Sequence, residues 1–169
     1  LFVSSSGADA ITVVDLAAAW RVLQAGAGAI GLTDDGIARA ARHLGLSSEY
    51  VEARIPTGAN PKGLALSPDG RALYAACRLS DEVLAIDATT LQVVGRIALG
   101  GPEGVTELRR GSQLFAYAGI SFQRQMSCST CHPEDNVDGL VYDIAADGGM
   151  GRNLVDNLSM RGLAAAESV

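Results

Sequence analysis

The sequence has no basic stripe. Its 169 residues include 13 Lys and Arg against 19 Asp and Glu, which gives a formal net charge of −6. Proteins that bind nucleic acids need cationic patches to neutralise phosphates, so a nucleic-acid partner is not expected. A positively charged protein partner is compatible with this balance.

The sequence also lacks an apolar run of the ~18–20 residues that a membrane-spanning helix needs, so no transmembrane segment is expected. It has no secretory signal, and it opens with Leu1 rather than Met. We therefore expect that a leader has been removed or that these residues are an internal piece of a longer chain. With 48% hydrophobic and 19% charged residues, the composition fits a folded protein rather than a disordered one.

An internal repeat organises the chain up to about Gly100. One shift of the sequence along itself places Leu1-Phe2-Val3 over Leu73-Tyr74-Ala75 and Asp9-Ala10-Ile11 over Asp81-Glu82-Val83. A shorter shift places Arg54-Ile55 over Arg96-Ile97. Since the first shift is the longer, one copy carries an insertion between positions 16 and 50, where the composition favours helices. A repeat of about 42 residues built from short β-rich runs is the size of a propeller blade.

The second copy predicts four strands, roughly over residues 64–66, 73–77, 83–87 and 93–97, with Ser67-Pro68-Asp69-Gly70 as the first turn. Only about two such blades fit before residue 104, whereas a propeller closes with about 4–8. We therefore expect an additional chain, or chain segment, that completes the propeller. The predicted domains are an incomplete β-propeller over 1–103, with a helical insertion at about 17–49, and a second module over 104–169.

One motif carries chemistry: Cys128-Ser129-Thr130-Cys131-His132. Two thiols three positions apart can each add to a vinyl group of a porphyrin, and the next residue then brings its imidazole to the iron. This pattern is typical of one covalently attached c-type haem per chain, with His132 as an axial ligand of the iron. Three alternatives stay open: a redox disulfide, a zinc site that recruits Cys77 and His43, and chance.

The sixth ligand of the iron has several candidates. Met150, in a glycine-rich stretch, and Met160, in a more apolar segment, both follow His132 in the chain and are candidate cofactor-binding residues. The other histidine, His43, a ligand from outside the chain, or an open position are the alternatives. Met126 is too close to the motif to reach the other side of the ring. The lone cysteine outside the motif, at position 77 in an apolar run, is interpreted as a buried strand residue.

The run from Asn60 to Gly70, Asn-Pro-Lys-Gly-Leu-Ala-Leu-Ser-Pro-Asp-Gly, resembles the bacterial propeller repeats named for a Tyr-Val-Thr-Asn signature. The motif and the segments at 138–143 and 158–162 are similar to proteins that fuse such a propeller to a module of the di-haem cytochrome c peroxidase superfamily. The resemblance implies a small, mostly α, loop-rich cytochrome c-like domain after the partial propeller, so the predicted fold class is mixed. It also implies two c haems, one acting on peroxide and one passing electrons, with His132 as the proximal ligand of the first.

This sequence holds a single C-x-x-C-H motif, so the second haem module of that family is missing from it. The leading hypothesis is therefore electron transfer by a haem c protein in a larger redox assembly, beside another redox protein or subunit. The first alternative is a peroxidase-like enzyme with Glu134, Asp135 or Asp138 as acid–base groups. The second is a propeller interaction subunit without a redox role. Because haem c is attached outside the bacterial cytoplasmic membrane, we expect a periplasmic or extracellular location.

Overall fold

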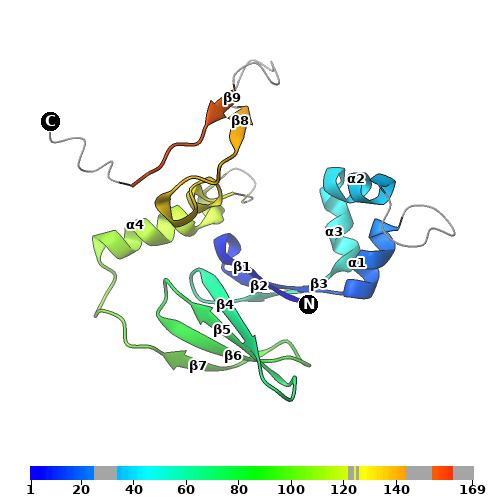
Figure 1. Ribbon diagram of the computed structural model, residues 1–169. Helices are drawn as coiled ribbons and strands as arrows, with labels where there is room; N and C mark the ends of the chain where they lie inside the picture. The colour runs from blue at the N-terminus through cyan, green and yellow to red at the C-terminus, as the bar shows by residue number, and fades with distance from the viewer. Residues whose placement is uncertain (25–33, 122–123, 125, 144–153, 162–169) are drawn as a thin grey trace. The chain divides into compact units, whose positions relative to one another are not determined.

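The computed structural model describes residues 1–24, 34–121, 124, 126–143 and 154–161. The chain divides into two compact units, Leu1–Val105 and Thr106–Val169. Figure 1 shows the elements of each unit along the chain. In the described ranges, no helix combines the length and the hydropathy that crossing a bilayer requires.

The first unit contains two antiparallel sheets. The three-stranded sheet has the order β1-β2-β3, and the four-stranded sheet has the order β4-β5-β6-β7, so each strand pairs with its sequence neighbour. The strands are β1 (Phe2–Ser5), β2 (Ala10–Val14), β3 (Val51–Pro56), β4 (Pro61–Leu66), β5 (Ala72–Cys77), β6 (Glu82–Asp87) and β7 (Val93–Ala98). The four strands that the sequence predicts therefore fall within β4 to β7.

The two sheets share their register at repeat-related positions. In the first sheet Ile11 pairs with Ile55, and in the second Val83 pairs with Ile97, which are the positions that the repeat aligns with them. A shift in register interrupts the ladder at the equivalent place in both sheets, at Val13/Val14 and at Ala85/Ile86. The repeat read from the sequence is therefore a repeat in backbone structure.

A turn closed by an aspartate lies at the end of β2 in the first copy and at the end of β6, the equivalent strand, in the second. Asp15 and Asp87 each accept hydrogen bonds from the backbone N–H groups two and three positions ahead, at 2.7–3.1 Å. These bonds hold the pKa of both carboxyls below the ordinary value. In the first copy Asp15 is also the N-cap of a helix, which is why the chain leaves the sheet there.

Among the described residues between β2 and β3, in the stretch expected to be an insertion, the chain forms three α-helices. They are α1 (Leu16–Leu23), α2 (Asp34–Arg42) and α3 (Ser47–Tyr50), with a 3₁₀ turn over Leu44–Leu46. The chain returns from α3 directly into β3, whose first residue is Val51. The amide of Asp15 donates to the carbonyl of Tyr50 at 2.9 Å. The two ends of the insertion therefore lie next to each other, where β2 ends and β3 begins.

The core of the first unit lies between the two sheets. Its buried members come from both sheets: Ile11, Val13, Ile55, Leu73, Ala75, Cys77, Leu84 and Ile86. Alternate residues of each strand face this layer, as the period of two in a strand requires. Two antiparallel sheets are thus held together by one apolar layer.

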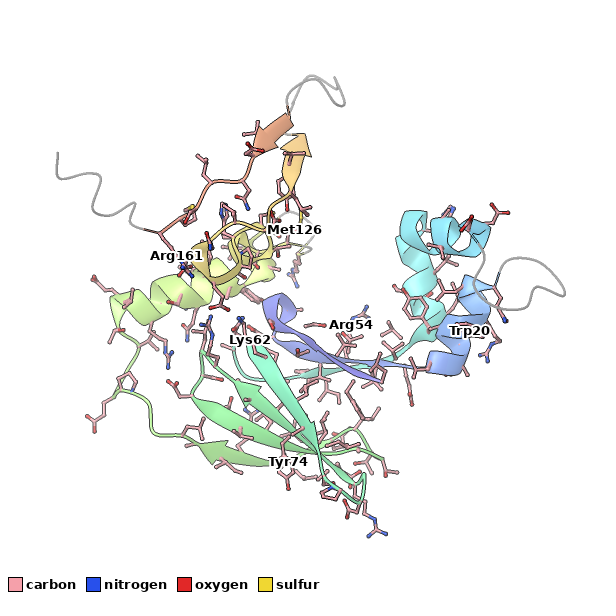
Figure 2. The ribbon with its side chains drawn as sticks, in the orientation of Figure 1. Trp20, Arg54, Lys62, Tyr74, Met126 and Arg161 are labelled. Carbon is pink, nitrogen blue, oxygen red and sulfur yellow. The ribbon has the colours of Figure 1, made fainter. Side chains whose placement is uncertain are left out.

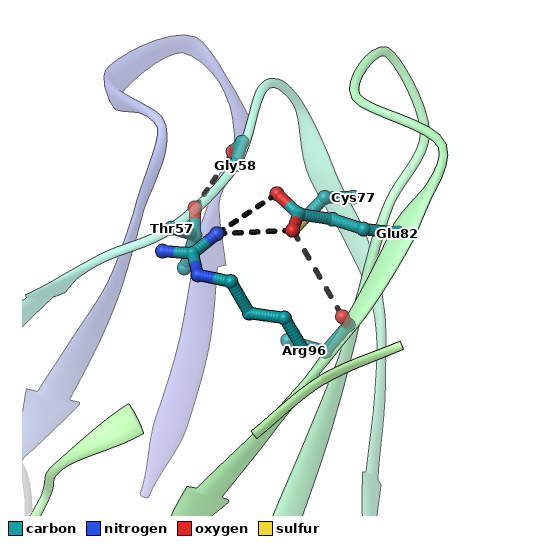
Figure 3. Close-up of polar contacts among 6 residues, drawn as sticks. Thr57, Gly58, Cys77, Glu82 and Arg96 are labelled. Carbon is teal, nitrogen blue, oxygen red and sulfur yellow. Dashed lines mark hydrogen bonds and ion pairs between the residues drawn. The ribbon is translucent and has the colours of Figure 1, made fainter. Parts of the chain in front are cut away.

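Cys77 is a buried strand residue, as its apolar neighbours in the sequence indicate. Its side chain is 1% exposed, and burial raises the pKa of its thiol. Figure 3 shows the polar groups beside it, where Arg96 donates to both carboxylate oxygens of Glu82 at 3.1 and 2.9 Å. The side chain therefore stays a neutral thiol within the core.

The second unit overturns the predicted fold class. Its described elements are the helices α4 (Glu107–Ala116) and α5 (Cys128–Cys131), the 3₁₀ turns Ala118–Ile120 and Pro133–Asp135, and the paired strands β8 (Val141–Asp143) and β9 (Leu154–Asp156). The described residues thus form a third antiparallel sheet and few helices, and no helical cytochrome c-like domain is evident among them. The prediction of a mixed fold ending in a mostly α domain is wrong. The chain is sheet-rich, and its first two sheets remain compatible with part of a propeller.

Candidate functional site

The two cysteines of the motif form the ends of a single helical turn. Ser127 is the N-cap of α5, and it forms a capping box with Thr130, whose hydroxyl accepts from the Ser127 amide at 3.0 Å. The amide of His132 donates to the carbonyl of Cys128 at 2.9 Å. Positions i and i+3 of a helix lie on the same side, so this turn presents Cys128 and Cys131 together.

Both thiols are free. Cys128 is exposed and Cys131 is half-buried, and neither forms a disulfide. Each sulfur is therefore available to form a bond with a group outside the chain. The same geometry gives a helix turn that offers two reactive atoms on one side and an imidazole immediately after them.

The side chain of His132 carries an unsatisfied atom. Its Nδ1 is buried, and no hydrogen-bond partner lies within reach in the described part of the chain. The ring of Phe115, which belongs to α4, lies 6.4 Å from the imidazole ring, with 46° between the two planes. Buried polar atoms almost always have a partner, and an exception calls for an explanation such as an ion or a catalytic role. Since imidazole is a common metal ligand, this unsatisfied nitrogen is compatible with His132 as a residue that binds a group from outside the chain.

The segment after β9 lies alongside the motif. The side-chain amide of Asn157 donates to the carbonyl of Cys131. Two further bonds continue the contact, since the amide of Met160 donates to the Asp135 carbonyl at 3.0 Å and Arg161 Nη2 donates to the Glu134 carbonyl at 2.9 Å. These bonds fix the chain that follows Cys131, and no periodic pattern in the sequence predicts a contact between segments so far apart.

A short polar network lies beside the second thiol. The Tyr142 hydroxyl donates to Asp138, whose other carboxylate oxygen accepts from the Leu140 amide at 3.0 Å. The hydrogen bond from Tyr142 holds the pKa of Asp138 below its ordinary value. The same bond, together with a second one to Cys131, raises the pKa of Tyr142. The tyrosine therefore remains protonated and keeps Asp138 ionised.

The candidates for the sixth ligand differ in whether the structure describes them and in how exposed their side chains are. Met150 lies outside the described residues, so its role stays a prediction. Met160 is 40% exposed and Met126 is 57% exposed, and Figure 2 shows the latter with its side chain. His43 is exposed, in the turn that follows α2 of the first unit. No group of three or more His, Cys, Asp and Glu side chains within the described ranges is arranged to hold a metal ion.

The three motif residues are predicted from the sequence as site residues, whereas the groups that contact them in the structure are not. Ser127 and Thr130 had a readable signal, because a hydroxyl residue followed three positions later by a hydrogen-bonding residue is the pattern of a capping box. Phe115, Tyr142 and Asn157 had none, since their contacts with the motif depend on tertiary structure.

Comparison with known proteins adds a short match. No protein-family model matches the chain. A 43-residue segment is 49% identical to the hydrazine synthase subunit beta of Kuenenia stuttgartiensis. The match covers 25% of this chain and 11% of the length of that protein. The chain is thus similar, over a quarter of its length, to a small part of a subunit of a synthase.

Proposed function

We propose that this chain is a c-type haem protein that transfers electrons as a subunit of a larger redox assembly. Cys128 and Cys131 would hold the haem through thioether bonds, and His132 would be an axial ligand of its iron. The observation that carries the proposal is the combination of two free thiols on one helical turn with an adjacent imidazole whose Nδ1 is buried and unsatisfied. When bound, the haem supplies a one-electron ferrous–ferric couple.

The chain's own residues position the attachment. The capping box of α5 fixes the turn that carries the thiols, and Asn157 restrains the carbonyl of Cys131. Preorganisation of this kind lowers the entropy that is lost when a group is bound. Tyr142 and Asp138 restrain the segment that follows, so the residues around the second thiol are held from both sides.

One further point supports a subunit of an assembly. The name of the similar protein describes one subunit of a synthase, which fits a chain that works beside other chains. Covalent haem attachment takes place on the outer side of the bacterial cytoplasmic membrane, so we propose a periplasmic or extracellular location.

The peroxidase-like alternative gains no support from Asp138, one of its three acid–base candidates. It requires an acid–base group near the iron, and Asp138 is engaged with Tyr142, Leu140 and Asn157. Because these hydrogen bonds keep the carboxylate ionised, Asp138 is poorly suited to donate a proton. Electron transfer makes no such demand on the residues beside the motif.

The test is to produce the chain in bacteria that contain the machinery for haem c attachment, and then to measure its intact mass and optical spectrum. We expect the mass of one haem on the polypeptide and a spectrum that changes between the oxidised and the reduced form. Cys77→Ala is the matched control, because that thiol is buried between the sheets and its loss should leave attachment unchanged. Bare polypeptide, or a disulfide between Cys128 and Cys131, would end the proposal. A spectrum that responds to peroxide would favour the enzyme instead.

A further inference from the structure

The four-stranded sheet has one covered and one open face. One face contributes side chains to the core, and we call it the inner face; these side chains are Leu73, Ala75, Cys77, Leu84 and Ile86. The outer face is formed by the alternate residues: its middle consists of Ala65, Tyr74, Ala76, Val83, Ala85 and Ile97, and Asp87, opposite Ala72, lies at one end. Tyr74 is 40% and Ile97 is 52% exposed, and in Figure 2 Tyr74 lies on the side of the sheet that faces away from β1–β3. None of the six side chains is charged, which is unusual for a sheet face in water.

The first sheet uses the equivalent face to pack against the inner face of the second sheet. The residues with which it packs on the inner face are Phe2, Ile11, Val13 and Ile55. The repeat aligns these positions with Tyr74, Val83, Ala85 and Ile97, in that order, and the cross-strand pairs are the same. Every one of the four is apolar in both copies, and all four belong to the outer face in the second copy. The outer face is therefore the repeat-related counterpart of a surface that, one copy earlier, covers a neighbouring sheet.

We propose that the outer face docks an antiparallel sheet of the same repeat that belongs to another subunit. The docked sheet would present a face like the inner face, with branched residues and alanines at alternate positions of its two central strands. The contact is then heterologous, with the outer face of one sheet on the inner-type face of the next. This inference rests on the part of the proposed function that makes the chain a subunit of an assembly, and it does not depend on the haem.

A second copy of this chain fits the outer face less well. The inner-type positions of its first sheet include Ser5 and Thr12, which take the places of Cys77 and Leu84. Their hydroxyl oxygens lie 2.8 Å apart in a hydrogen bond, so docking a second copy would bury two hydroxyls where the observed interface has a thiol and a leucine. Because the two hydroxyls bond to each other, their burial costs less than that of unpaired groups, but they offer less apolar surface than the thiol and the leucine. Residues 106–169 contain no third copy of the repeat.

The experiment supplies a sheet of the proposed kind within the full chain. A duplicate of residues 59–100, which is one repeat, is inserted after Gly100. The probe is the substitution Ile97→Cys in the original copy, whose alkylation by iodoacetamide is followed by peptide mass spectrometry. We expect the inserted repeat to slow alkylation of this thiol about tenfold or more, since each tenfold reflects docking that favours the covered state by about 1.4 kcal/mol. Haem attachment is measured separately by intact mass, so failure of the docking proposal is distinguishable from failure of the proposed function.

Two variants sharpen the result. Val3→Cys reports a site that is 41% exposed on the first sheet and away from the outer face, and its alkylation should be unchanged by the insert. Ala85→Arg in the original copy places a charge in the middle of the outer face, and it should restore fast alkylation at position 97 in the chain that contains the insert. An inserted repeat that stays unfolded, or that folds without slowing alkylation, would refute the proposal, because the outer face is proposed as the surface on which such a sheet is stable. Alkylation in the chain without the insert that slows with protein concentration would instead assign the outer face to a second copy and overturn the proposal.

Discussion

Replacing His132 by phenylalanine should stabilise the haem-free chain around the motif. An unsatisfied buried polar atom costs about 1–3 kcal/mol, and Nδ1 of His132 is such an atom in the described part of the chain. His132→Phe removes this atom and keeps a planar ring next to Phe115, whose ring lies 6.4 Å from the imidazole. The free energy of local unfolding should therefore rise by about the same 1–3 kcal/mol.

Hydrogen exchange measures this effect at the motif itself, which matters because a chain of two compact units need not unfold in one step. The reporting amides are those of Thr130, bonded to the Ser127 carbonyl at 3.0 Å, and of residue 132, bonded to the Cys128 carbonyl at 2.9 Å. An increase of about 1–3 kcal/mol slows their exchange by roughly 5- to 140-fold. The matched control is His43→Phe, which replaces the other histidine at an exposed position and should leave these two rates unchanged.

Unchanged or faster exchange in His132→Phe would refute the reasoning. It would mean that Nδ1 finds a partner, such as a water molecule, and that the site carries no unpaired group waiting for a ligand. The expected result is a functional site that is less stable than it could be, which is a common cost of activity. The haem-loaded variant should also show an altered optical spectrum, because phenylalanine cannot bind iron.

Three further predictions concern the thiols, the core and acid pH. Cys131→Ala should leave haem attached through one thioether bond, whereas the double substitution of Cys128 and Cys131 by alanine should leave none on the denatured chain; intact mass decides both. Leu84→Ala should lower the free energy of unfolding of the first unit by about 2–5 kcal/mol, because the Leu84 side chain is fully buried. Val83→Ala, on the outer face, should lower it by less than about 1 kcal/mol in the isolated chain. Equal losses in denaturant titrations would contradict the assignment of the two faces. The folded chain holds the pKa of Asp138 below its ordinary value of 3.8. The stability that this carboxylate contributes is therefore complete above pH 3.8 and is lost as the pH falls through the lowered pKa of the folded chain. Hydrogen exchange at the Leu140 amide should show this loss.

The repeat could be predicted from the sequence because it is written into residues that determine register. Asp15 and Asp87 close the same turn, and the register shift near the end of the strand before this turn, β2 or β6, recurs in both copies. Alternation of apolar residues then fixes which face of each strand enters the core, since a slip of one residue would turn every side chain over. Periodicity and turn chemistry thus sufficed for the four strands of the second copy, β4 to β7.

The second unit could be predicted only where its contacts are local. Helix α4 begins at a local capping signal, since the hydroxyl of its N-cap Thr106 accepts from the Arg109 amide at 3.2 Å. The strands β8 and β9 escaped notice because each has only three residues, too few for a period to be detected. The helical domain was expected from a resemblance rather than from a pattern in residues 104–169, and that is the part of the prediction that failed.

His132 and the outer face are separate departures from the rule that polar atoms are paired and apolar surfaces are covered. They belong to different compact units, so we expect that each can be changed without the other. Ala85→Arg should leave haem attachment intact, because it alters only the sheet that carries Val83 and Ile97. His132→Phe should leave the protection of Ile97→Cys by an inserted repeat intact, for the same reason. If either substitution abolished both properties, the two units would have to unfold together, and neither the motif nor the outer face could be treated as a site in its own right.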